Sequence, residues 1–163
     1  MRKLTFFFSF AFALLFIITS TSYSQKMIDY TWDDYYVKFQ IPATFNVDKN
    51  NATEFGAGDN DCYLSIYPKS GKTLTFSEMK QALEDWAKDS YVTGYNKVNE
   101  LEDLNGYWGV YLDGIKSSNN LPTTMLLLIH PNHTSTRLYV WINYKDIAFD
   151  TALKMLKSFK PTY

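Results

Sequence analysis

Two histidines are the residues best suited to metal or acid–base chemistry, because imidazole serves both purposes. His130 and His133 stand three positions apart around a Pro-Asn turn, so both rings could reach one metal ion. A structural zinc site needs four ligands, and no further cysteine, histidine or carboxylate lies nearby in the sequence. We therefore predict no metal and no other cofactor, with His130 and His133 as the residues to test for zinc or copper.

Cys62 is the only cysteine, which excludes an intrachain disulfide. Its simplest interpretation is a small apolar residue on a strand. A nucleophilic pair with either histidine is conceivable, because such partners need not be adjacent in sequence, but nothing in the pattern selects it. The chain also lacks GxSxG, HExxH, P-loop and GxGxxG motifs. We therefore predict that the protein is not an enzyme.

The clustered carboxylates fit structural roles better than catalytic ones. The run 58–61 (GDND) is rich in oxygen ligands, but it lacks the later glycine and the final glutamate of a calcium-binding EF-hand loop. We interpret it as a polar turn. Glu100, Glu102 and Asp103 lie on one predicted strand edge, where they are expected to face water. Their spacing alone cannot establish a glycosidase acid pair, which requires two carboxylates across a cleft.

Two groups of aromatic residues could form binding surfaces. Trp32 and Tyr36 lie beside Asp33 and Asp34, which should keep this segment close to water. Exposed aromatic pairs are natural anchors for a protein partner. We therefore predict Trp32 and Tyr36 as the partner-binding residues. The second group, Tyr139 and Trp141 (YVW), is expected to lie under a helix.

The first 24 residues have the features of a secretory signal peptide. Arg2 and Lys3 supply the positive start, residues 4–18 are almost wholly apolar, and small polar residues follow up to Ser24. The apolar stretch is shorter than the roughly 20 residues that span a bilayer. We expect cleavage near Ser24 and a secreted or periplasmic mature protein that does not span a membrane.

Charge excludes one class of partner. Removal of Arg2 and Lys3 leaves 14 basic and 17 acidic residues, so the mature net charge is −3. Nucleic-acid binding requires a basic patch, and no run of lysine and arginine occurs. Nucleic acid is therefore not the expected partner.

Periodicity places these residues on an α+β framework. A capping box at Thr75 and Glu78 begins a helix expected over 75–89, and an amphipathic stripe predicts a second over 146–160. Asn105-Gly106 joins two strand-like runs as a hairpin. Alternating or continuous apolar runs predict further strands at 35–48 (bent or hairpin-like at Pro42), 54–57, 62–67, 124–130 and 136–144. The prediction is a single domain over 25–163: an antiparallel sheet of about six strands with two amphipathic helices packed on it.

This order of elements resembles the PsbP-like fold, which includes the photosystem II extrinsic subunit, the Ran-binding Mog family and bacterial relatives of unknown function. The resemblance rests on the proline-bent opening segment VKFQIPATFNV, the hairpin at Asn105-Gly106 after the first helix, and the final amphipathic helix ending in SFKP. It covers nearly all of residues 28–160. It implies a non-catalytic domain that docks on a partner, and it transfers no functional residues.

The function expected from the sequence is therefore a secreted or periplasmic, non-enzymatic interaction domain. Its expected partner is another envelope or secreted protein. The alternative is a small-ligand or metal-binding module, which would use a tyrosine-lined cleft or the two histidines.

Overall fold

The computed structural model describes residues 25–162, apart from the side chains of Glu102 and Asp103. The expected signal peptide, residues 1–24, lies outside the described part. The strands are β1 (Met27–Trp32), β2 (Val37–Pro42), β3 (Asn46–Asn51), β4 (Glu54–Gly58), β5 (Cys62–Ser70), β6 (Val92–Thr93), β7 (Asn99–Leu104), β8 (Tyr107–Lys116), β9 (Leu121–Ile129), β10 (Thr136–Tyr144) and β11 (Lys160–Pro161). The helices are α1 (Phe76–Asp89) and α2 (Phe149–Ser158), with short 3₁₀ turns at Asp33–Tyr35 and Asp146–Ala148.

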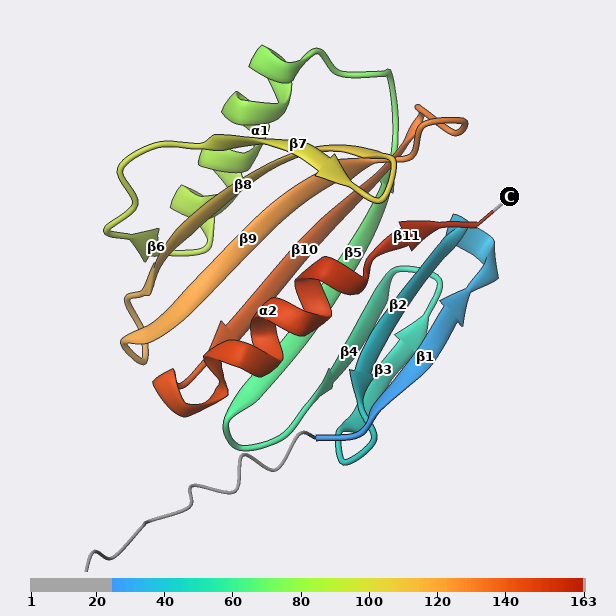
Figure 1. Cartoon of the computed structure of the whole chain (residues 1–163). Helices are drawn as coiled ribbons and strands as arrows, with labels where there is room; N and C mark the ends of the chain where they lie inside the picture. The colour runs from blue at the N-terminus through green and yellow to red at the C-terminus, as the bar shows by residue number, and fades with distance from the viewer. Residues whose placement is uncertain (1–24, 163) are drawn as a thin grey trace, which may run out of the picture.

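The strands form two antiparallel sheets (Figure 1). The larger has eight strands in the order β3-β4-β5-β10-β9-β8-β6, and β7 also pairs with β8. The smaller has the order β1-β2-β11. The predicted α+β class is confirmed, although the strands are more numerous than the expected six and are divided between two sheets.

Each face of the larger sheet carries its own apolar core. On one face, α2 and the smaller sheet enclose an aromatic centre in which Phe39 stacks on Phe159 at 5.2 Å between ring centroids. On the other face, Met79 and Leu83 of α1 pack against Leu127 of β9. Figure 1 shows α2 and the smaller sheet in front of the larger sheet, with α1 behind it. The apolar stretch of β9 is buried because both faces are covered, as its continuous apolar sequence predicted.

The locally encoded elements follow the sequence closely. Thr75 Oγ1 accepts the Glu78 N–H at 3.3 Å, while the Glu78 carboxylate accepts the Thr75 N–H at 2.9 Å, so the capping box is confirmed. Asn105 and Gly106 have φ of 53° and 96°, the positive values that a type I′ hairpin turn requires. These two signals succeed because neighbouring residues alone determine them.

Two element boundaries differ from the prediction. The segment expected as one bent strand or hairpin over 35–48 is split: β2 lies in the smaller sheet and β3 in the larger one. Pro42 ends β2, and the chain then crosses between the sheets with Phe45 buried on the way. The last helix also stops early, because Phe159 adopts an extended conformation and leads into β11.

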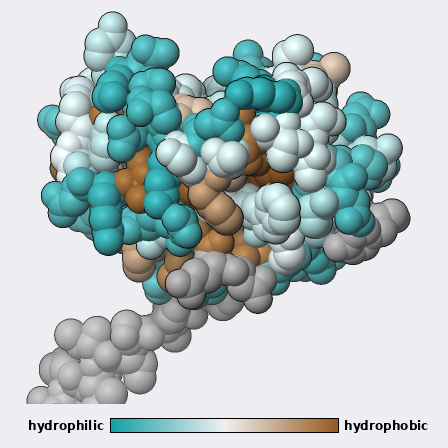
Figure 2. Space-filling view, turned by 90° about the horizontal axis from the view of Figure 1, so that it is seen from above, coloured by the Kyte–Doolittle hydropathy of each residue, from teal (hydrophilic) through white to brown (hydrophobic). Residues whose placement is uncertain are grey.

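The outer surface is mostly polar. Seen from above in Figure 2, hydrophilic side chains dominate, and hydrophobic ones show in the hollows between them. No helix in residues 25–162 is long and apolar enough to cross a membrane.

Candidate functional site

Three of the residues singled out from the sequence meet at one end of the molecule. The rings of Tyr36 and His133 stack in parallel, with 4.0 Å between centroids and a 4° angle between planes. His130 lies beside both, at 6.1 Å from Tyr36 and 4.7 Å from His133. Tyr36 precedes β2, whereas the histidines belong to the β9–β10 connection, so residues far apart in sequence form this Tyr36–His133 surface.

The backbone of Tyr36 is held in an unfavourable conformation. Its φ of 52° lies in the left-handed region, which a bulky residue rarely adopts. Its carbonyl accepts the Thr162 N–H at 2.8 Å and lies 3.5 Å from the Tyr107 hydroxyl. These contacts keep the ring 42% exposed while its backbone is tied to the C-terminal strand.

His130 has a structural role beneath this surface. It is 1% exposed, and its Nδ1 accepts the backbone N–H groups of Asn132 at 3.0 Å and His133 at 3.1 Å. An accepting Nδ1 places the ring proton on Nε2, which donates to the Thr162 carbonyl at 3.3 Å. Burial lowers the pKa of His130, and the neighbouring His133 acts in the same direction. The neutral ring therefore fixes the hairpin tip that carries His133.

This geometry leaves little capacity for a metal. Both ring nitrogens of His130 are engaged by backbone groups, so the ring would have to break these bonds to become a ligand. Within residues 25–162, no group of three or more histidine, cysteine, aspartate or glutamate side chains is placed to hold a metal ion. The two histidines form a packing and stacking pair with Tyr36.

Trp32 does not share the exposure predicted for it. Its side chain is only 6% exposed, and its ring packs edge-on against Tyr35 at 4.6 Å and near Phe55 at 6.2 Å. The expectation of an exposed Trp32 is therefore wrong. The 3₁₀ turn that follows β1 carries Asp33 and Asp34 into water, while Trp32 itself points into the core.

The remaining nucleophile candidate lies far from the histidines. Cys62 is 3% exposed, and burial together with the nearby Asp59 and Asp61 raises the pKa of its thiol to about 12. It pairs with Tyr144 at one end of β10, whereas His133 adjoins the other end, Thr136. A strand of this length separates them by roughly 25 Å, which rules out a cysteine–histidine pair.

The acidic turn has the structural role expected of it. Asp59 accepts the backbone N–H groups of Asp61 and Cys62 at 2.8 and 2.9 Å, and Asp61 forms an ion pair with Lys145. On the other predicted strand edge, Glu100 pairs with Lys80 of α1 at 2.7 Å.

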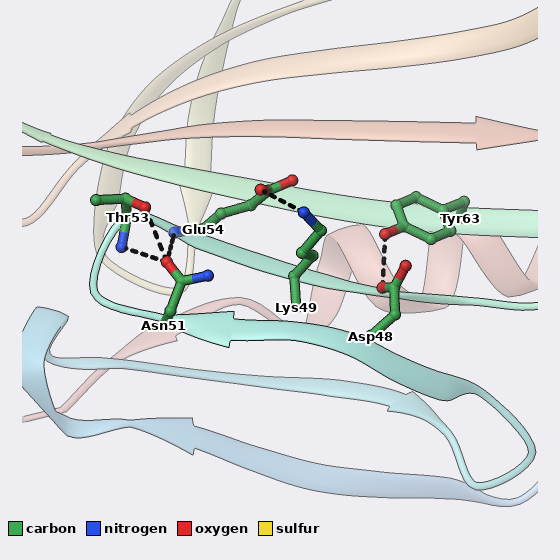
Figure 3. A network of polar contacts seen from close by, with 6 residues as sticks. All are labelled: Asp48, Lys49, Asn51, Thr53, Glu54 and Tyr63. Carbon is green, nitrogen blue, oxygen red and sulfur yellow. Dashed lines mark hydrogen bonds and ion pairs between the residues drawn. The ribbon is translucent and has the colours of Figure 1, made fainter.

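A polar network also orders the β3–β4 hairpin (Figure 3). Asn51 Oδ1 accepts hydrogen bonds from the Thr53 N–H, the Thr53 hydroxyl and the Glu54 N–H. The Tyr63 hydroxyl donates to Asp48 at 2.7 Å. Burial is the main cause that raises the pKa of Tyr63, and this hydrogen bond raises it further. Because these groups satisfy one another, the network stabilises an edge hairpin.

Tyr139 and Trp141 are covered by α1, as expected. The ring of Trp86 on α1 meets Tyr139 at 5.2 Å and Trp141 at 5.8 Å, both edge-on. These aromatic side chains join helix to sheet.

A concave site that was missed from the sequence lies between α2 and β7. It is a groove of about 360 Å³ whose floor is formed by Tyr111 and Asp113 of β8 and by Thr124 and Leu126 of β9. Its walls are apolar, with Leu153 and Leu156 on α2 opposite Leu101 on β7, and Asp113 stands at one end. The only sequence signal was an acid, Asp113, between Tyr111 and Ile115 on one face of β8. Its place in a groove depends on α2, which comes from a distant part of the sequence.

Comparison with known proteins identifies a shared fold. No family model matches the chain, and no curated protein matches it in sequence. The structure of the Ran-binding protein Mog1p from Saccharomyces cerevisiae superposes with a TM-score of 0.56 at 8% identity, covering 85% of this chain and 96% of Mog1p. A Mog1 point mutant gives the same TM-score and identity over 84% and 96%. The predicted similarity to the PsbP-like and Mog fold is thus confirmed at the level of fold.

Proposed function

We propose that this protein is an exported, non-enzymatic interaction domain that binds another envelope or secreted protein through the Tyr36–His133 surface. The observation that carries the proposal is the exposed aromatic ring of Tyr36, stacked flat on His133 and held by a strained backbone. Strained residues persist where the surrounding structure over-determines them, and they cluster at functional sites. A preorganised, partly exposed aromatic side chain loses little conformational entropy when a partner covers it.

Charge beside this surface indicates the chemistry of the partner. Asp33 and Asp34 are exposed next to Tyr36, and neither forms an ion pair within residues 25–162. An acidic and aromatic patch is complementary to lysine and arginine side chains, which can pair with the carboxylates and lie over the ring. The partner is therefore a protein that presents a basic patch.

The shared fold supports a protein partner. Mog1p is described as a Ran-binding protein, so the same architecture presents a protein-binding surface in at least one relative by fold. At 8% identity, the likeness supports the kind of partner and not Ran itself.

Export rests on the composition of residues 1–24. Arg2 and Lys3, the apolar stretch and the small residues up to Ser24 are typical of a cleaved signal peptide. Mass spectrometry of protein recovered from its native host should find Gln25 as the N-terminal residue. A mature chain that still begins at Met1 would contradict export by this route.

The partner surface is tested by crosslinking a tagged protein in its native host, with two matched variants. Tyr36→Ala removes the stacked ring. Tyr91→Ala is the control, because Tyr91 is also exposed, at 72%, and also has a positive φ, 56°, but lies elsewhere. We expect one specific crosslinked protein with the native chain and with Tyr91→Ala, and its loss with Tyr36→Ala.

The captured protein is then purified and titrated against both variants at low and high salt. Affinity should fall with Tyr36→Ala and with increasing salt, because the proposed contact includes exposed charges. Equal capture by all three proteins would refute the assigned surface. No specific protein captured by any of them would refute the interaction function itself.

A further inference from the structure

The groove between α2 and β7 has the form of a small-ligand site. Its volume of about 360 Å³ lies within the range of such sites, which combine apolar walls with a few placed polar groups. In Figure 1, strands of the larger sheet run between α2 and β7. On β9 the floor residues Thr124 and Leu126 are buried, whereas Asp113 on β8 is exposed.

One end of the groove is polar and ordered. Thr124, which is 5% exposed, donates its hydroxyl hydrogen to Asp113 Oδ1 at 2.5 Å. Tyr144, which is 8% exposed, also lines the groove. The buried Thr124 hydroxyl thus holds one oxygen of the Asp113 carboxylate, while the Asp113 side chain remains exposed.

The carboxylate itself lacks a counterion. Among residues 25–162, no lysine, arginine or histidine forms an ion pair with Asp113, and its second oxygen accepts no protein hydrogen bond. A positioned carboxylate with a free oxygen beside apolar walls favours a cationic hydrogen-bond donor. The rim of the groove on the opposite end carries Lys157, whose charge would repel a cation placed there.

We propose that the groove binds a small molecule with an apolar body and a single cationic amine head. The amine donates to Asp113, and the apolar body lies along α2 between Leu153 and Leu101. From Phe149 to Lys157 the helix spans roughly 12 Å, at about 1.5 Å per residue, which suits a body of about eight carbons. The unlike charges at the two ends of the groove set the direction in which the ligand lies.

This site is separate from the Tyr36–His133 surface. None of the residues that line the groove belongs to that surface, and the two sites occupy different parts of the fold. Loss of amine binding would therefore leave partner binding intact, so each proposal stands or fails by its own experiment.

The test uses three probes of equal length, octylamine, octanol and octanoate, titrated by calorimetry against the mature protein. Methyl NMR spectra locate the bound probe by shifts of the Leu101 and Leu153 methyl groups. We expect octylamine to bind most tightly and octanoate most weakly, with the shifts confined to the groove.

Two Asp→Asn substitutions distinguish a direct contact with the amine head group from a general effect of the protein's net charge. Asp113→Asn should weaken octylamine binding by about fivefold, the scale of a partly exposed ion pair, and change octanol binding less than twofold. Asp89→Asn, on α1 across the sheet, should leave all three affinities unchanged. Leu153→Trp should weaken all three probes by filling the groove.

Each other result overturns the proposal. Octanoate binding at least as tightly as octylamine would exclude the cationic head. An equal effect of Asp113→Asn and Asp89→Asn would exclude the Asp113 contact. Absence of binding by all three probes to the folded mature protein, verified by circular dichroism, would exclude the site.

Discussion

At the scale of single residues, the Nδ1 lone pair of His130 orders the turn that carries His133. Its Nδ1 accepts two backbone N–H groups in the β9–β10 connection, and the proton on Nε2 is directed at the C-terminal strand. A second proton would have to bind at Nδ1, where both N–H groups already point. Protonation would therefore break two hydrogen bonds and bury a charge. The position of His133 thus depends on His130 being neutral.

This linkage predicts a pH-dependent stability. The unfolded chain has a histidine pKa near 6.5, and burial lowers the pKa of folded His130 below that value. Between these values the unfolded state binds more protons, so the free energy of unfolding must fall as pH decreases through this window. The slope is at most about 1.4 kcal/mol per pH unit for one group. Urea unfolding between pH 7.5 and 5 measures it.

Two variants isolate the residue responsible. His130→Gln should lower stability at pH 7.5 and remove most of the dependence below pH 6.5. His133→Asn leaves the backbone N–H of position 133 in place and should retain the dependence. Glu78, whose pKa is lowered to about 2 chiefly by its Lys72 partner, does not titrate in this range. An unchanged slope in His130→Gln would contradict the mechanism.

The two aromatic residues predicted as a pair should differ in their effect on stability. Trp32 is buried, so Trp32→Ala should lower the free energy of unfolding by about 3–5 kcal/mol, as for other core aromatics. Tyr36→Ala removes an exposed stacked ring and should lower it by about 1 kcal/mol. Chemical denaturation of both variants measures this difference. Similar losses in the two would show that the ring of Tyr36 is a core element and not a free surface.

At the scale of elements, prediction from sequence succeeded where the determining contacts are local. The capping box at Thr75 and the turn at Asn105-Gly106 involve residues within a few positions of one another. The end of α2 and the separation of β2 from β3 depend on distant partners. Asn105, for example, donates to the Lys157 and Phe159 carbonyls at the end of α2, a contact invisible in helical periodicity.

The start of α1 allows the contribution of a local contact to the free energy of unfolding to be measured. Thr75→Ala removes the side-chain acceptor for the Glu78 N–H and should lower the free energy of unfolding by about 1 kcal/mol. Ser77→Ala, an exposed position in the same first turn, is the control and should change stability by less than about 0.5 kcal/mol. Thermal unfolding of the two variants compares them. Equal effects would mean that the cap adds nothing specific to the helix.

At the scale of the whole molecule, the candidate sites exist only because distant segments meet. Tyr36, His130 and His133 were each recognisable from sequence, but their convergence requires the smaller sheet to dock against the hairpin between β9 and β10. Trp32 was misjudged because local charge indicated water, whereas the direction of its ring is determined by a core assembled from both sheets. The α2 groove carried still less signal, since its walls come from β7 and α2.

Thr162, which directly follows β11, joins these parts. Thr162 donates its N–H to the Tyr36 carbonyl, and its own carbonyl accepts from His130. Thr162→Pro removes the N–H donor, because proline lacks a backbone N–H, and it retains the carbonyl that accepts from His130. Thr162→Ala keeps the N–H and serves as the control for loss of the side chain.

Loss of the Thr162 donor should therefore act on both the strained tyrosine and the histidine turn. We expect Thr162→Pro to lower the free energy of unfolding by about 1–2 kcal/mol, with Thr162→Ala close to the native protein. Hydrogen exchange should then show faster exchange at the amides of Tyr36, Asn132 and His133, while the α1 amides remain protected. Uniformly faster exchange across the molecule would show global destabilisation, and unchanged exchange at Tyr36 would show that β11 does not hold this surface. Selective loss of protection at these three amides would establish that the backbone contact of Thr162, at the end of the chain, holds the partner surface in place.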